Sequence, residues 1–221
     1  MSEHHENGRP NPWLAIPATD YEGHMGSPSV GQLAYLGSVF AELLGRYAPR
    51  SLAVVGCATG NGLEHVGPNT IRTVGLDLNP EYLETARRRF AHRLPGLELL
   101  QIDLSAPGPA LEPFDLVHCA LVLEYLEPAA AVTKLAGWLA PGGILSVVLQ
   151  LPVPDHGPVS RTPFRSLESL APLMRLVEPE HLGQLAAGAG LQHLESRVDT
   201  LPSGKRFHVS CHRREGPPPS R

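Results

Sequence analysis

The residues best placed for chemistry are a glycine-rich turn and an acid that follows it. The apolar run 52–55 breaks into the turn 56–62, which contains Gly56, Gly60 and Gly62, and Asp77 closes the next apolar run. Glycines let a backbone approach a ligand closely, and a carboxylate at the C-terminal end of a strand can accept hydrogen bonds from two vicinal hydroxyls. The combination predicts a nucleoside site.

Two of the acids after strands have an alternative, purely structural interpretation. Asp77 could serve the start of the helix that begins at Pro80, but Asn79 already fits the N-cap there, so the ribose role is favoured. Asp103, after the apolar run 97–102, either recognises an adenine amino group or only starts a turn.

The elements that position these residues alternate between strand and helix. Helices are expected from Pro80 and over about 128–139, and alternation of this kind favours a parallel sheet covered on both faces. A hairpin signal at 202–205 adds an antiparallel pair at the end of the sheet. The strands are predicted at 52–55, 72–76, 97–102, 115–119, 144–151, 191–201 and 206–213.

Other helices are expected at both ends of this alternating region. Residues 28–47 carry apolar side chains at helical spacing, with Ser29, or Ser27 before Pro28, as the N-cap. A Pro-rich connection at 152–163 is followed by helical segments near 166–174 and 179–189.

Composition restricts the class of protein. The 221 residues fit one α/β domain, and no apolar run approaches the roughly 18 residues of a membrane span. The three cysteines lack CxxC spacing, which indicates reduced thiols, a cytoplasmic location and no metal site. A net charge of -4 disfavours a nucleic-acid partner, because phosphate backbones require a cationic surface.

Two cofactor classes use a strand, a glycine turn and a distal acid: nicotinamide dinucleotides and S-adenosylmethionine. The dinucleotide fingerprint is G-x-G-x-x-G, but a motif starting at Gly60 has His65 where its third glycine should be. Nicotinamide binding is therefore the weaker hypothesis.

The order of motifs resembles that of the class I S-adenosylmethionine-dependent methyltransferases, from about Leu52 to the final hairpin. Residues 56–60 are similar to the first motif of that family, which holds the methionine moiety, and 75–79 to its second, whose acid binds the ribose. The remaining segments, 101–104, 114–120 and 139–144, resemble the adenine-bracketing third motif, the fourth motif and the turn before the fifth strand.

The resemblance implies an α/β, Rossmann-like doubly wound sheet of order 3-2-1-4-5-7-6 with an N-terminal helical lid. It divides the chain into a tail and lid helix (1–48), a methyltransferase domain (49–214) and a disordered tail (215–221). The implied cofactor-binding residues are Tyr21, Met25, Gly56, Cys57, Ala58, Gly60, Asn61, Asp77, Leu78, Tyr82, Ile102, Asp103, Leu104, Cys119 and Ala120.

The sequence departs from the family at two positions of the first motif. Val54 stands where the family has an acid, and Ala58 stands where it has its middle glycine. Ala58 requires a turn with a compatible φ angle. The lost acid has three candidate substitutes: Glu64, His24 and Tyr21.

Methyl transfer depends largely on holding a nucleophile in line with the methyl group, and a base is needed only for an acceptor that keeps its proton. The candidate catalytic residues are His118, Glu124 and His24. His118 either lines the pocket or points into a helix. Glu124 and Tyr125 follow the fourth strand, where family members often place acceptor-facing side chains, or they start a surface helix.

A small-molecule acceptor, attacked through O, N or C, is the expected substrate of a monomer or homodimer. The family's DNA-amino enzymes carry an Asn/Asp-Pro-Pro-Tyr-like motif where this chain has residues 119–122. The Pro-rich stretch, with His156, Ser160 and Arg161, forms the acceptor wall or a surface connection. Two rival functions stay open: a catalytically silent protein of the same fold and an NAD-dependent oxidoreductase.

Overall fold

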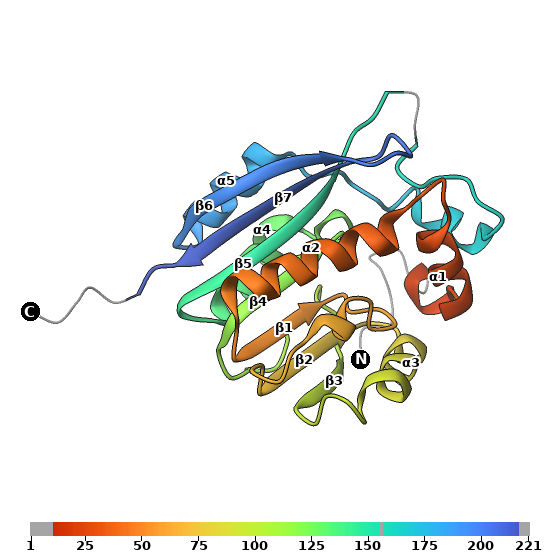
Figure 1. Cartoon of the computed structure of the whole chain (residues 1–221). Helices are drawn as coiled ribbons and strands as arrows, with labels where there is room; N and C mark the ends of the chain where they lie inside the picture. The colour runs from red at the N-terminus through yellow and green to blue at the C-terminus, as the bar shows by residue number, and fades with distance from the viewer. Residues whose placement is uncertain (1–10, 155–156, 217–221) are drawn as a thin grey trace, which may run out of the picture.

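A seven-stranded mixed sheet with helices on both faces forms the body of the protein (Figure 1). The computed structural model describes residues 11–154 and 157–216. Its strands are β1 (Ser51–Val55), β2 (Arg72–Asp77), β3 (Leu97–Gln101), β4 (Phe114–Ala120), β5 (Leu139–Leu151), β6 (Leu191–Thr200) and β7 (Arg206–Arg214). Its helices are α1 (Ala18–Gly26), α2 (Gln32–Tyr47), α3 (Pro80–Phe90), α4 (Pro128–Gly137) and α5 (Pro179–Gly188), with 3-10 turns η1 (Pro12–Ala15), η2 (Leu63–His65), η3 (Leu123–Tyr125) and η4 (Arg165–Leu170).

The sheet order, β3-β2-β1-β4-β5-β7-β6, confirms the predicted topology. The first five strands run parallel to their neighbours, and β7 pairs antiparallel with both β5 and β6. The C-terminal ends of the parallel strands therefore share one edge, which is where open α/β sheets bind ligands.

Alternation along β1 shows how the sheet is buried on both faces. Leu52 and Val54 pack in the cluster under α2 and α3, whereas Ala53 and Val55 pack in the cluster under α4 and α5. Burial on both sides explains why the strand reads as an unbroken apolar run rather than an alternating one. Asn79 caps α3 as predicted, and its side chain accepts hydrogen bonds from the backbone of Glu81 and Tyr82.

Three predicted boundaries are wrong. The helix expected over 28–47 begins only at Gln32, since Gly31 precedes it with a φ of 67° and the Ser29 side chain contacts Ser27 rather than the helix. The segment near 166–174 is the short 3-10 turn η4. The fifth strand starts at Leu139 rather than 144, because Leu139 already pairs with Phe114 of β4, ahead of an irregularity in the register that contains the Pro-Gly-Gly stretch.

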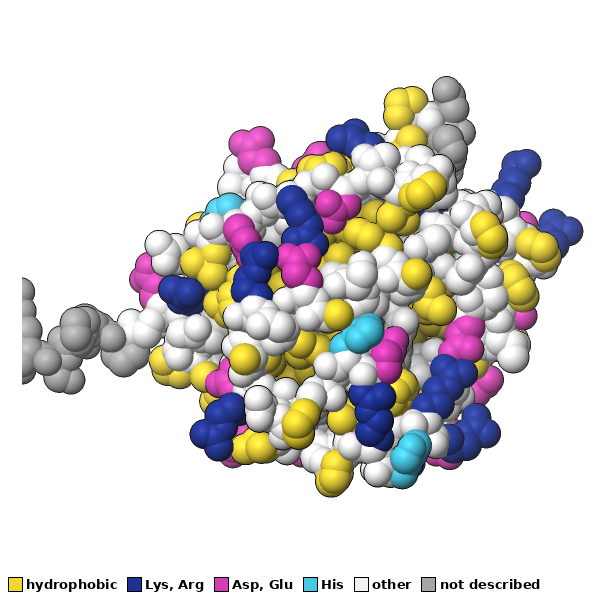
Figure 2. Space-filling view, in the orientation of Figure 1, with side chains coloured by type: hydrophobic (Ala, Val, Ile, Leu, Met, Phe, Trp, Pro, Cys, Tyr) yellow, Lys and Arg dark blue, Asp and Glu magenta, His cyan; other side chains and the backbone are white. Residues whose placement is uncertain are grey.

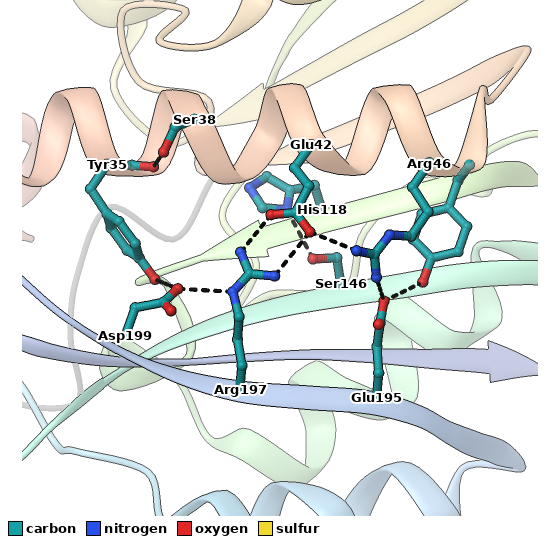
Figure 3. Close-up of polar contacts among 10 residues, drawn as sticks. Tyr35, Ser38, Glu42, Arg46, His118, Ser146, Glu195, Arg197 and Asp199 are labelled. Carbon is teal, nitrogen blue, oxygen red and sulfur yellow. Dashed lines mark hydrogen bonds and ion pairs between the residues drawn. The ribbon is translucent and has the colours of Figure 1, made fainter.

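Helix α2 is joined to the edge strand β6 by a chain of charged and polar contacts (Figure 3). Glu42 forms ion pairs with Arg46 of its own helix and with Arg197 of β6, both at 2.8 Å. Arg197 also binds Asp199 at 2.9 Å, and Arg46 pairs with Glu195. A segment near the start of the chain is thereby fixed to one near its end.

Charged side chains of both signs are interspersed over the face that α2 presents (Figure 2). This face carries no broad basic patch. Among the described residues, no helix is long and apolar enough to cross a membrane.

Candidate functional site

A cavity opens at the C-terminal ends of the parallel strands, as the motif positions predict. Its empty volume is about 1140 Å³, with open solvent at its mouth included. Twelve of the predicted residues line it: Tyr21, His24, Met25, Gly56, Ala58, Asp77, Leu78, Tyr82, Ile102, Asp103, Leu104 and Ala120.

The glycine turn is fixed to the neighbouring strand by its own backbone. The amides of Gly56 and Cys57 donate to the carbonyl oxygen of Leu76 at 2.8 and 3.0 Å. Gly56 has a φ of 66°, and a Cβ there would lie 2.4 Å from the Val122 side chain, so this position requires glycine. Ala58 adopts the left-handed conformation with a φ of 45°, which the family's glycine would adopt without strain.

Asp77 lies between the turn and the start of α3. Its carboxylate accepts hydrogen bonds from the backbone amides of Ala58 at 2.8 Å and Asn79 at 2.9 Å, and the side chain lines the cavity. Burial raises the pKa of Asp77 to about 6, although these amide hydrogen bonds oppose the shift. The structural interpretation of this acid is confirmed, since it accepts a hydrogen bond at the start of α3. Its position on the cavity surface is compatible with the ribose role, which stays a prediction.

Asp103 likewise has two structural roles. Its carboxylate accepts hydrogen bonds from the backbone and the hydroxyl of Ser105, at 2.9 and 2.5 Å, which forms the turn predicted by the structural interpretation. Asp103 also lines the cavity between Ile102 and Leu104, whose apolar side chains are suited to a flat base.

The N-terminal segment covers the cavity with aromatic side chains. Trp13 lies edge-on to Tyr21 and Tyr125, with ring centroids 6.4 and 5.2 Å away, and Tyr21 lies 5.3 Å from Tyr82. The Tyr82 hydroxyl is buried and has no hydrogen-bond partner within residues 11–154 and 157–216. Tyr21, His24 and Met25, which were predicted to face the cofactor or the reaction, all lie in helix α1.

Helix α1 is attached on two sides. Glu22 accepts a hydrogen bond from the hydroxyl of Thr59 in the glycine turn at 2.6 Å, and Asp20 accepts one from Ser166 of η4, also at 2.6 Å. Gly23 packs so closely that a Cβ there would lie 2.1 Å from the ring of Phe164. The cover and the turn beneath it are thus one connected unit (Figure 1).

The opposite end of the cavity is polar. His24, Gln32, Gln150 and Lys205 are all buried there and line it. The Gln150 side-chain oxygen accepts hydrogen bonds from Lys205 at 3.1 Å and from Gln32 at 3.4 Å. Burial lowers the pKa of Lys205 to about 8.

Sequence reasoning missed most of this polar end. Gln150 gave one usable signal, since it is the only strongly polar side chain late in the apolar run 144–151. Lys205 gave none, because a lysine beside a hairpin turn is normally exposed. Of the expected acceptor wall, Pro158 and Val159 line the cavity, Ser160 and Arg161 do not, and His156 lies outside the described residues.

Two candidate catalytic residues do not reach the cavity. His118 points to the α2 side of the sheet, where its ring stacks on Phe40 with the centroids 4.9 Å apart. Its Nδ1 lies 3.3 Å from the Ser146 hydroxyl (Figure 3). Strand alternation directs it there, so we drop it as a base. Glu124 is fully buried and does not line the cavity. Its carboxylate accepts a hydrogen bond from the backbone amide of Gln150 at 2.8 Å.

Five other candidate residues make contacts elsewhere in the fold and do not line the cavity. Cys57 and Cys119 are buried in the two core clusters, where burial raises the pKa of both thiols. Gly60 packs against Phe90, Asn61 donates to the carbonyl of Leu33 at 3.1 Å, and Glu64 accepts from the backbone of Gly62. The described part of the chain holds no cluster of three or more metal-ligating side chains.

The fold and this cavity define a Rossmann-like protein with a nucleoside-sized cleft. A family model described as "Methyltransferase domain" matches residues 54–145. Trans-aconitate 2-methyltransferase from Methylobacterium radiotolerans is 36% identical over 124 residues, which is 52% of this chain and 46% of the relative. Ubiquinone biosynthesis O-methyltransferase from Xylella fastidiosa is 35% identical over 101 residues, covering 42% and 39% of the two chains.

Among solved structures, the N-methyltransferase NodS from Bradyrhizobium japonicum, in complex with S-adenosyl-L-homocysteine, matches with a TM-score of 0.64 at 20% identity. The match covers 82% of this chain and 86% of that one. The chain spans about half the length of the trans-aconitate methyltransferases it matches. Residues 54–145 thus match a methyltransferase domain, and the chain has the Rossmann-like fold of a solved methyltransferase that binds S-adenosyl-L-homocysteine.

Proposed function

We propose that this protein transfers a methyl group from S-adenosylmethionine to an O, N or C atom of a small molecule. One observation carries the proposal: a single cavity joins the glycine turn and Asp77 to the buried polar end at β5 and β7. A cofactor and an acceptor can therefore lie next to each other in one cavity. Such an arrangement provides the proximity on which methyl transfer depends.

The residues of the turn and of the neighbouring strands fit the cofactor. Asp77 would accept the ribose hydroxyls, and the 56–58 backbone would contact the methionine moiety. Ile102 and Leu104 would flank the adenine, with Asp103 at its edge. When bound, S-adenosylmethionine supplies an electrophilic methyl group on a sulfonium.

The chain's own contribution is positioning and exclusion of water. The aromatic side chains of Trp13, Tyr21 and Tyr125 contact one another and line the cavity, where they would limit the access of water. His24 is the one predicted base that lines the cavity, and its Nδ1 lies 3.0 Å from the Thr162 hydroxyl. Burial lowers the pKa of His24 to about 4, which makes it a weak base, so the arrangement favours an acceptor that needs no deprotonation at neutral pH.

The names of the relatives agree with oxygen as the attacked atom. One group of relatives is named for a carboxylic acid, trans-aconitate, and another for an O-methylation in ubiquinone biosynthesis. A carboxylate oxygen is already deprotonated at neutral pH. We therefore favour O-methylation over attack by nitrogen or carbon.

The remaining expectations are part of the same proposal. We keep the division into a lid region (1–48) and a methyltransferase domain (49–214), a cytoplasmic location, a monomer or homodimer, and no nucleic-acid partner. Most of the expected disordered tail, 215–221, lies outside the described residues.

Calorimetric titration with S-adenosylmethionine, S-adenosylhomocysteine and NAD⁺ tests the proposal. We expect the first two to bind and NAD⁺ not to bind. Absence of heat and of thermal stabilisation by either sulfur compound would refute it.

A silent cofactor-binding protein is the second candidate, and the left-handed Ala58 and the buried Val54 favour it. Binding of S-adenosylhomocysteine without methyl transfer to any carboxylic acid tested would support that candidate instead.

A further inference from the structure

Lys205 is the most unusual charged residue in the cavity. Its side chain is 6% exposed, and within the described residues its Nζ makes one hydrogen bond, to Gln150, and no ion pair with a carboxylate. A buried cation without a counter-charge is costly, and such groups are normally paired. A bound anion would therefore supply the missing counter-charge of Lys205.

We propose that Lys205 and Gln32 form an acceptor subsite that binds the carboxylate of a monocarboxylic acid with an apolar body. This inference rests on the proposed function, because the acceptor half of the cavity is defined by the cofactor half.

The hydrogen-bond geometry supports a carboxylate. An ammonium group has three donors, and Lys205 uses one on Gln150. Gln32 uses one N–H of its amide on the same Gln150 oxygen, which leaves the second N–H unassigned. Gln150 itself is held by its Nε2, which donates to the carbonyl of Pro158 at 2.8 Å. Two free Lys205 donors and one from Gln32 match the two oxygens of one carboxylate.

The position of Lys205, Gln32 and Gln150 relative to the sheet indicates that they bind the acceptor rather than the cofactor. Asp77 ends β2 and Gln150 lies near the end of β5, and the strands β1 and β4 separate them. Three strand spacings amount to roughly 14 Å. The ribose and the methionine moiety would occupy the β2 and β1 side, so the cluster lies on the side left for a second molecule.

The rest of the lining determines the class of acid. Lys205 is the one lysine or arginine among the described residues that line the cavity, and the 157–174 segment adds Val159, Leu167, Leu170 and Met174. A tricarboxylate such as trans-aconitate would place two further negative charges in an apolar space without cations. A single carboxylate on an apolar body fits both features.

The test measures binding of acids and matched neutral amides to the protein saturated with S-adenosylhomocysteine. The probes are trans-cinnamate and decanoate, their primary amides, and trans-aconitate. We expect each monocarboxylate to bind at least about tenfold more tightly than its amide, and more tightly than trans-aconitate. Lys205→Met should abolish the preference for acid over amide, whereas Arg206→Met, which removes the exposed neighbouring charge, should keep it.

Each contrary result has a defined meaning. Equal affinity for acids and amides, tighter binding of trans-aconitate, or no binding of any acid would overturn the inference while the proposed function stands. Weaker S-adenosylhomocysteine binding by Lys205→Met would overturn it too, because Lys205 would then serve the cofactor. Failure of the unmodified protein to bind S-adenosylhomocysteine refutes the proposed function instead.

Two further variants guard against structural explanations. Asp155 lies outside the described residues, and Asp155→Asn should leave acid affinity unchanged. A rise in acid affinity would mean that an Asp155 carboxylate competes for Lys205 and would overturn the premise that a bound anion supplies its counter-charge. If Lys205→Met does not fold, Lys205→Gln replaces it, and the comparison of acid and amide on the unmodified protein decides by itself.

Discussion

The carboxylate of Asp77 accepts a hydrogen bond from the backbone nitrogen of Ala58 at 2.8 Å, and Ala58 is held in a left-handed conformation with a φ of 45°. A non-glycine residue there costs roughly 1 kcal/mol or more. A hydrogen bond to a charged acceptor contributes a similar amount or more. The acid expected to bind the ribose thus also stabilises the strained turn that would hold the rest of the cofactor.

Ala58→Gly should relieve this strain. We expect a gain of about 0.5–1 kcal/mol in the free energy of unfolding, because removal of the strain outweighs the extra backbone entropy of glycine in the unfolded chain. Urea denaturation measures it. Ala48→Gly is the matched control, since Ala48 has a φ of 41° at the end of α2, away from the cavity. A destabilised Ala58→Gly variant would show that the alanine methyl contributes packing rather than strain.

Asp77→Ala should weaken S-adenosylhomocysteine binding by about 1.5–3 kcal/mol through the lost hydrogen bonds to the ribose. Titration calorimetry on a variant shown by circular dichroism to be folded checks this. The circular dichroism control is needed because the substitution also removes the acceptor for Ala58 and Asn79. Unchanged affinity in a folded variant rejects the ribose role.

Cofactor affinity should depend on pH through Asp77. Its pKa is raised to about 6, and hydroxyl donors favour the ionised form, so protonation competes with binding. We expect a constant dissociation constant above about pH 7, rising towards tenfold per pH unit below about pH 6. Asp77→Asn should bind more weakly and without this dependence. A flat profile for the unmodified protein would count against the mechanism.

Glu124 should make stability fall as the pH rises. Burial raises its pKa from 4.5 to about 7, so the folded state favours the protonated acid. The stability it contributes is fully present below about pH 4.5 and lost as the pH rises through about 7, by about 3 kcal/mol in total. Melting temperatures from pH 5 to 9 should therefore fall less steeply for Glu124→Gln than for the unmodified protein. Glu180→Gln, at an exposed acid, should keep the original slope, and identical slopes for both variants would disprove the assignment.

Gly23→Ala should detach the cover from the segment that follows β5. The added methyl would lie 2.1 Å from the Phe164 ring, so either the ring or α1 must shift and their present packing is lost. We expect easier proteolytic cleavage near α1 and weaker cofactor binding, with the sheet intact. Gly45→Ala is the matched helical control, since nothing lies within 4 Å of its added Cβ. Equal protease resistance of the two variants would show that α1 is not held by this contact.

Features that depend on neighbouring residues could be predicted from the sequence, whereas features that depend on the packing of distant segments could not. The strands, the hairpin and the Asn79 cap were predictable because they depend on apolar runs and on turn and cap chemistry in neighbouring residues. The strand order was implied by the resemblance to the methyltransferases and is confirmed. The environment of His118 was not, since strand alternation offers two faces and only the packing of α2 selects one. The buried state of Lys205 was also unpredictable, because it depends on elements about 50 to 180 residues away in the chain.

The contacts between Glu42 and Arg197 connect regions that lie 155 residues apart. Without the outermost strand Glu42 would keep only Arg46, and without α2 Arg197 would keep only Asp199. The edge hairpin and the helix that precedes the first strand therefore each remove part of the other's charge pairing when they are deleted, so the two ends of the chain are coupled through exposed ion pairs of modest strength.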